Sequence, residues 1–138
     1  MSSARILVVE DYEPFRRYIC ASVAKSLDYS IVGEVSDGLQ AVREAEALRP
    51  DVILLDIGLP GLDGLEAARR IRKLSPRSKI LFVSQESSPD VIDAALSSGA
   101  LGYVVKAYAA TELLAAVERL CEGRKYVGDG YDCQATQP

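Results

Sequence analysis

Residues 52–64 read Val-Ile-Leu-Leu-Asp-Ile-Gly-Leu-Pro-Gly-Leu-Asp-Gly. The stretch opens with four apolar residues in a row, and Asp56 follows them directly. A short run that is apolar at every position is typical of a strand covered on both faces in a parallel sheet. An acidic residue after such a run is most often a helix N-cap or a solvated loop residue, so Asp56 gains meaning only from the segments around it.

Short apolar runs recur on both sides of this stretch: Ile6–Val9 and Ile80–Val83 are unbroken, and Ile31–Val35 and Leu101–Val105 are interrupted. Between them the apolar residues follow helical spacing, and the first such stripe consists of Phe15, Ile19, Val23 and Leu27. Strict alternation of strand and helix predicts an α/β fold, a doubly wound five-stranded parallel sheet with helices on both faces.

The residues between the periodic segments agree with this division. Asp37 followed by Gln40 resembles a capping box, and Ser88-Pro89 supplies an N-cap with proline at the first helical position. Gly99 and Gly123 stand where the last two helices should end. We therefore expect one domain over residues 4–123, followed by a polar, aperiodic tail or truncated linker over 124–138.

Composition excludes several classes of protein. The chain has 138 residues, of which 49% are hydrophobic, and this is enough for one domain with a sizeable core. No apolar run approaches the ~20 residues of a membrane span, and no export signal begins the chain, so we expect a cytoplasmic protein without membrane contact. The net charge of −4 without a basic cluster weighs against direct binding of nucleic acid.

Cysteine and histidine usage narrows the chemistry further. Cys20, Cys121 and Cys133 form an odd, widely spaced set, which favours neither a disulfide framework nor a zinc site. The chain has no histidine, which removes Ser-His and Cys-His catalysis and means that the chain cannot itself donate phosphohistidine.

Polar residues of complementary kinds follow four of the predicted strands. Glu10-Asp11 follows the first, Asp56 the third, Ser84 the fourth and Lys106 the fifth. In a doubly wound sheet the carboxyl ends of the strands share one edge, where ligands bind. A single polar residue after a strand is best explained as a surface or capping residue. Polar residues at four strand ends together predict a ligand-binding site at this edge.

The residue types at this edge point to phosphoryl chemistry. Three carboxylates that repel one another, offering only oxygen ligands, suit Mg²⁺. A lysine and a serine hydroxyl can contact phosphoryl oxygens, and phosphoryl transfer depends mainly on positioning and charge neutralisation. Since no histidine or reactive cysteine is present, Asp56 is the natural nucleophile and would form an aspartyl phosphate.

These residues together resemble the receiver domains of two-component response regulators, over roughly residues 4 to 123. The signature is residues 56–64, together with Glu10-Asp11, Ser84 and Gly102-Tyr103-Val104-Val105-Lys106. The resemblance implies the flavodoxin-like, CheY-like strand order 2-1-3-4-5. It further implies that a sensor histidine kinase phosphorylates Asp56 and that the domain is a signalling module in a phosphorelay, not an enzyme.

By the same resemblance, Glu10, Asp11, Asp56 and the main-chain carbonyl of Gly58 bind Mg²⁺. Lys106 and Ser84 then contact the phosphate, and Ser84 and Tyr103 form the switch, in which Ser84 moves and the Tyr103 ring turns into the vacated space. A static Tyr103 in the strand is the alternative.

Two departures from the family pattern stand near the site. Lys106 is followed by Ala107 where the family usually has proline, so this peptide is expected to be trans or, if cis, strained. Ser84 is followed by Gln85-Glu86 instead of a small residue, which predicts crowding of the pocket mouth and slow self-phosphorylation.

Residues 58–67 and 116–127 look like receivers of the NarL/FixJ (LuxR-type) subfamily, which normally precede a DNA-binding domain. The chain is therefore expected to be the N-terminal half of a transcription regulator, or else a stand-alone or phosphorylation-independent receiver that acts by protein contact. Pairing of two copies on phosphorylation is a further expectation.

Three other functions compete with this interpretation. An aspartyl-phosphate hydrolase would need an acid at position 58, where the chain has glycine. A flavin-binding module would need a phosphate-cradling loop where Glu10-Asp11 stands. A degenerate receiver that takes no phosphate is the third, favoured by Gln85 and Ala107.

Overall fold

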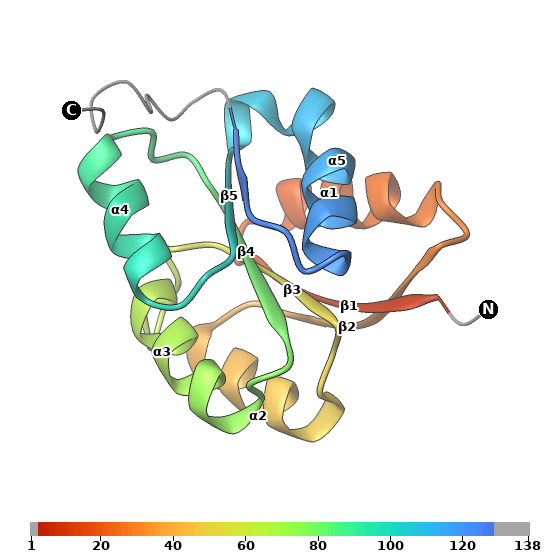
Figure 1. Ribbon diagram of the computed structural model, residues 1–138. Helices are drawn as coiled ribbons and strands as arrows, with labels where there is room; N and C mark the ends of the chain where they lie inside the picture. Colours follow the sequence, from red (N-terminus) through yellow and green to blue (C-terminus); the bar gives the residue numbers. More distant parts are fainter. Residues whose placement is uncertain (1–2, 129–138) are drawn as a thin grey trace.

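The computed structural model of the protein describes residues 3–128 and alternates strands with helices (Figure 1). The strands are β1 (Ala4–Val9), β2 (Tyr29–Val35), β3 (Val52–Leu55), β4 (Lys79–Ser84), β5 (Gly102–Val105) and β6 (Tyr126–Val127). The helices are α1 (Glu13–Ala24), α2 (Gly38–Leu48), α3 (Gly64–Leu74), α4 (Pro89–Ser97) and α5 (Ala109–Cys121), and a 3₁₀ turn, η1 (Lys106–Tyr108), precedes α5.

The strands form one parallel sheet in the order β2-β1-β3-β4-β5-β6. The predicted α/β class and the predicted order of the first five strands are confirmed. The chain crosses from β2 on one side of β1 to β3 on the other, so the strand order reverses beside β1. In sheets of this kind the crevice at such a reversal is where ligands bind.

The helices cover both faces of the sheet, as Figure 1 shows. Helices α1 and α5 pack on one face, and α2, α3 and α4 pack on the other. The central strands therefore contribute side chains to an apolar layer on each face of the sheet. In β1, Ile6 and Val8 belong to one layer and Leu7 and Val9 to the other. No helix of the described part of the chain is long and apolar enough to span a bilayer.

The predicted helix caps are found. The Asp37 side chain accepts a hydrogen bond from the Gln40 amide at 2.8 Å, and the Ser88 hydroxyl accepts one from the Val91 amide at 3.2 Å. The first predicted stripe was wrong at its end, because α1 ends at Ala24 and Leu27 is 96% exposed.

The end of the described chain differs from the expected tail. Tyr126 and Val127 pair with Gly102 and Tyr103 as a sixth strand, so the sheet continues past residue 123. The segment is too short to show periodicity, and its strand conformation comes from pairing with β5. The rest of the expected tail, residues 129–138 with Cys133, lies outside the described residues.

Candidate functional site

The carboxyl ends of the strands meet at one edge of the sheet, around an open hollow of about 590 Å³. The structure brings together there all the residues that the sequence placed after strands: Glu10, Asp11, Asp56, Ser84 and Lys106. Gly58, Gln85 and Glu86 also line this hollow. Residues that are up to 96 positions apart in the chain, from 10 to 106, thus share one pocket because parallel strands end on the same side.

Glu10, Asp11 and Asp56 form an acidic cluster. One carboxylate oxygen from each lies within 4.8 Å of the other two. Glu10 is 1% and Asp56 8% exposed, whereas Asp11 is exposed to solvent. Carboxylates this close repel one another, and burial weakens the screening by water. The oxygen-only donor set, with one open side, fits a hard divalent cation such as Mg²⁺.

Lys106 reaches this cluster from the end of β5. Its Nζ lies 2.9 Å from Glu10 Oε1 and 3.2 Å from Asp56 Oδ2. Burial alone would lower the pKa of Lys106, but its contacts with the two carboxylates outweigh burial and raise the pKa above the usual value. The peptide to Ala107 is trans, as are all peptides of the described chain, so the lysine reaches the pocket without a cis bond.

Glu10 is fixed by several contacts as well as by the lysine. Its Oε2 accepts a hydrogen bond from the Tyr12 amide at 3.1 Å, and its main-chain carbonyl accepts one from Arg16 Nη1 at 2.9 Å. Burial raises the pKa of Glu10, and the charge of Asp56 adds to the rise, while Lys106 and the Tyr12 amide oppose it. The side chain is therefore held in place at the pocket, with a nearby cation, Lys106, that opposes the effect of burial.

The loop after β3 orients Asp56. The Ile57 amide donates to Asp56 Oδ1 at 2.7 Å, and the Gly64 amide donates to the Ile57 carbonyl at 2.7 Å. Gly64 starts α3 so close to β3 that a Cβ there would collide with the main-chain carbonyl of Asp56. A Cβ at Gly58, by contrast, would meet nothing within 4 Å.

Tyr103 lies in β5 with its side chain only 1% exposed. Its hydroxyl donates to the Glu86 carbonyl at 2.7 Å, and the Glu86 amide donates to Ser84 Oγ at 3.2 Å. Burial raises the pKa of Tyr103, and the charges of Glu86 and Asp56 add to this, against the Ser84 contact. In this structure the ring is already turned inward, beside the loop that follows β4.

Comparison with known proteins agrees with the geometry. The family model described as the response regulator receiver domain matches residues 6–118. The chain belongs to this receiver family. Its acidic cluster, Ser84 and Lys106 thus lie in a receiver, a signalling domain, and not merely in a sheet of similar shape.

Several relatives share about a third of this receiver's residues. Chemotaxis protein CheY of Listeria monocytogenes is 32% identical over 115 residues, covering 83% of this chain and 96% of that protein. Transcriptional regulatory protein NarL of Mycobacterium tuberculosis is 33% identical over 123 residues, covering 89% of this chain and 57% of that protein. The chain thus spans little more than half the length of that regulator.

Solved structures give the same answer. The signal receiver domain of NarL from M. tuberculosis superimposes with a TM-score of 0.86 at 32% identity, covering 90% of this chain and all of that one (100%). A LuxR-family response regulator from Aurantimonas superimposes equally well, with a TM-score of 0.86 at 32% identity, covering 91% of this chain and 89% of that chain. This receiver is therefore close to receivers of the NarL and LuxR type.

Sequence reasoning missed Arg16 and Phe15, which contact charged residues of the receiver's site. Arg16 anchors the Glu10 carbonyl and also lies 3.5 Å from Glu34 Oε1. The Phe15 ring lies under the Lys106 ammonium, 4.7 Å from Nζ to the ring centroid. Phe15 belongs to the apolar stripe of α1, and this spacing does not mark it as a partner of Lys106. Nothing in the spacing of Arg16 marks it as a partner of Glu10.

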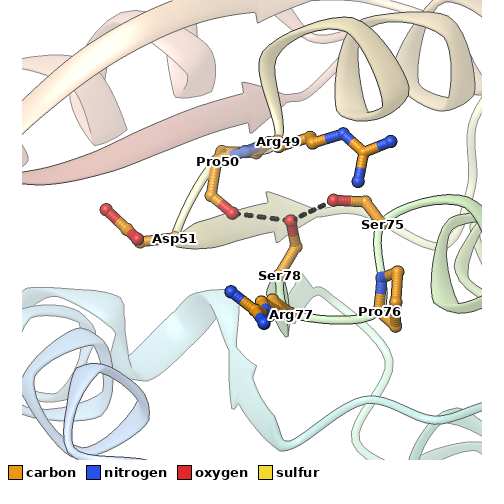
Figure 2. Close-up of a pocket in the computed structure, with 7 residues that line it drawn as sticks. All are labelled: Arg49, Pro50, Asp51, Ser75, Pro76, Arg77 and Ser78. Atoms are coloured by element: carbon orange, nitrogen blue, oxygen red, sulfur yellow. Dashed lines mark hydrogen bonds between the residues drawn. The ribbon is translucent and has the colours of Figure 1, made fainter.

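A second pocket of the receiver, about 460 Å³, lies at the opposite, amino ends of β3 and β4 (Figure 2). Ser78 Oγ donates to the Pro50 carbonyl at 2.6 Å and lies 2.7 Å from Ser75 Oγ. These buried hydroxyls therefore brace the turns that enter the two strands. None of the acidic cluster lies here, so the candidate site is the pocket at the carboxyl edge.

Proposed function

We propose that Asp56 accepts a phosphoryl group from the phosphohistidine of a sensor kinase and that Mg²⁺ binds beside it. One observation carries the proposal: the acidic cluster spans less than 4.8 Å, and the Lys106 ammonium touches two of its members. Membership of the receiver family also supports the proposal.

In the reaction, a carboxylate oxygen of Asp56 attacks phosphorus, the bond from phosphorus to the histidine nitrogen breaks, and that nitrogen takes the electron pair. Lys106 faces Asp56 and can pair with a phosphoryl oxygen, while Ser84 Oγ, at the end of β4, can donate to another. A bound Mg²⁺, held by Glu10, Asp11, Asp56 and the Gly58 carbonyl, would supply positive charge opposite the remaining oxygens.

The output of this event runs through Ser84 and Tyr103. Both are linked to Glu86, Ser84 through the amide and Tyr103 through the carbonyl. A phosphoryl group that draws Ser84 Oγ toward itself would compete for the Glu86 contact and move the loop that carries the Tyr103 partner. The Tyr103 ring is buried in this structure. Of the two conformations of the proposed switch, this one is the conformation with the ring turned inward.

The wider role that we propose is that of the N-terminal half of a cytoplasmic transcription regulator of the LuxR type, with no direct binding of nucleic acid by this domain. Relatives named as transcriptional regulatory or response regulator proteins, among them the NarL proteins, support this role. Two copies would pair on phosphorylation, and sedimentation with and without acetyl phosphate measures that step.

The test is intact mass after incubation with acetyl phosphate and Mg²⁺, for wild type and Asp56→Asn. A single phosphoryl adduct that requires Mg²⁺ and is missing from the variant would support the proposal and its acceptor. No adduct, even from a panel of histidine kinases, would favour a receiver that works by protein contact without phosphate.

A further inference from the structure

Lys106 is the only long flexible side chain that reaches both buried members of the acidic cluster within the described residues. A lysine has four rotatable bonds, and fixing them costs conformational entropy of roughly 2 kcal/mol. We propose that Phe15 is a positioning residue that holds the Lys106 ammonium at the wall of the pocket, where a phosphoryl group on Asp56 would meet it. This inference rests on the proposed phosphorylation of Asp56.

Two carboxylates and an aromatic ring lie around Lys106 Nζ. An ammonium has three N–H groups. Nζ donates to Asp56 Oδ2 at 3.2 Å and forms an ion pair with Glu10 Oε1 at 2.9 Å, and the centroid of the Phe15 ring lies 4.7 Å from Nζ. A cation within ~6 Å of a ring centroid is attracted by the negative face of the ring.

The ring differs from the two carboxylates in what happens during the reaction. Asp56 forms a bond to phosphorus, and Glu10 is also a proposed ligand of the metal. The contacts of both carboxylates with the Lys106 ammonium therefore change during the reaction. Phe15 has no such second role. Its attraction for the ammonium therefore persists in the free and the phosphorylated states, and it keeps Nζ from following a departing partner into solvent.

Phe15 is itself well fixed. It lies in the first turn of α1, where its amide donates to the Tyr12 carbonyl at 3.1 Å. Its ring packs against the apolar layer between α1, α5 and the sheet, and lies 5.6 Å from the ring of Tyr18. The ring thus connects the first helix of the domain to Lys106, the residue that follows β5.

The test compares Phe15→Leu, which keeps an apolar side chain but removes the ring face, with Phe15→Tyr, which keeps the face. Tyr18→Leu is the matched control, because it removes a neighbouring ring of α1 that does not touch Lys106. We expect the initial rate of Asp56 phosphorylation by acetyl phosphate to fall roughly threefold to tenfold in Phe15→Leu. Phe15→Tyr and Tyr18→Leu should stay within about twofold of wild type.

A double-mutant cycle separates positioning from packing. If Phe15 acts through the lysine, Phe15→Leu adds no further loss in a Lys106→Met background. An equal loss in both backgrounds, or a rate for Phe15→Leu equal to that of wild type, would overturn the inference.

A second measurement does not depend on phosphorylation. The methylene protons next to Lys106 Nζ should be shifted upfield by the Phe15 ring current in wild type, and the shift should vanish in Phe15→Leu. If wild type takes no phosphoryl group but the ring shift is present, the proposed function fails while the Phe15 contact stands. If the shift is absent, the positioning role fails whatever the phosphorylation result.

Discussion

Two glycines after β3, Gly58 in the loop and Gly64 at the start of α3, have opposite surroundings. At Gly64 the backbone of α3 approaches β3 so closely that a Cβ would meet the Asp56 carbonyl and lie 2.7 Å from Ile57 Cα. At Gly58, the second residue after the proposed phosphoacceptor, a Cβ would meet no atom within 4 Å. Position 64 therefore serves the fold, whereas position 58 faces the pocket.

We expect Gly64→Ala to lower the free energy of unfolding by about 1–3 kcal/mol, because the backbone on both sides must shift. Gly58→Ala is the matched variant and should stay within about 0.5 kcal/mol of wild type. Urea unfolding of the three proteins measures this. Equal losses in both variants would show that the close approach at Gly64 carries no special cost.

The buried phenol of Tyr103 predicts a pH effect at the same scale. Because its pKa is raised, the native state keeps the phenol proton at pH values where the unfolded chain has lost it. The free energy of unfolding should therefore fall as pH rises from the ordinary tyrosine pKa of about 10 through the raised one. In Tyr103→Phe this part of the alkaline loss should disappear.

Urea unfolding between pH 8 and 11 measures the slope for wild type and Tyr103→Phe. Tyr12→Phe, at an exposed side chain, controls for the loss of a hydroxyl as such. At the lower pH, Tyr103→Phe should also cost about 0.5–1.5 kcal/mol, since its hydrogen bond to the Glu86 carbonyl is lost. An unchanged alkaline slope would contradict the role assigned to this phenol.

At the scale of elements, β6 covers the outer edge of β5. The Tyr126 amide donates to the Leu101 carbonyl and the Gly128 amide to the Tyr103 carbonyl, each at 3.2 Å. Tyr126 also lies beside α5, where the Arg119 guanidinium carbon is 5.9 Å from the ring centroid. The edge strand is thus short and tied to both a strand and a helix, which keeps β5 from presenting unpaired groups.

Two truncations isolate this strand. A chain ending at Gly128 keeps β6, and a chain ending at Lys125 lacks it. We expect the shorter chain to be less stable by about 1–3 kcal/mol, because the main-chain pairing with β5 and the packing of Tyr126 and Val127 are lost. Chemical denaturation compares the pair, and equal stabilities would mean that β6 contributes nothing to the fold.

Most elements could be predicted from the sequence because their signals are local. β3 was predicted with its observed bounds, since all four residues are apolar and Asp56 ends the run. Helix α4 was marked by Ser88-Pro89, which combine a side-chain cap with a fixed backbone angle. Leu27 misled the prediction of α1, because helical spacing continued in the sequence after the helix had ended.

The site could be predicted in part for the same reason. Glu10, Asp56 and Lys106 each follow an apolar run, and parallel strands bring such residues together. Phe15 and Arg16 could not be found in this way, because their partners are chosen by how α1 packs on the sheet. The strand β6 was missed because two residues show no periodicity.

At the scale of the whole molecule, the acidic cluster opposes folding, because it gathers like charges from β1 and β3. A cation that binds only the folded chain should therefore stabilise it. With Mg²⁺ at ten times its dissociation constant, we expect the free energy of unfolding to rise by about 1.4 kcal/mol. Thermal or urea unfolding with and without MgCl₂ measures this, and NaCl of matched ionic strength is the control.

Asp11→Asn should lose most of this stabilisation by Mg²⁺, because it removes one of the three carboxylates of the cluster. Asp11 is the exposed member, so its removal leaves no buried group unpaired. A gain of the same size in wild type and variant would place the ion elsewhere. EDTA should return wild type to its stability without metal.

The direction of the first and last strands has a practical consequence for sensors built on this domain. Because β1 and β6 both run toward the edge with the acidic cluster, Ala4 begins at the far edge and Val127 finishes at the near one. A fluorophore attached at Gly128 would stand beside β5, because the Gly128 amide donates to the Tyr103 carbonyl, whereas one attached at Ala4 would stand at the opposite edge of the sheet. Labels at these two positions would thus report different things: the first the surroundings of Tyr103 in β5, the second the opposite edge of the sheet.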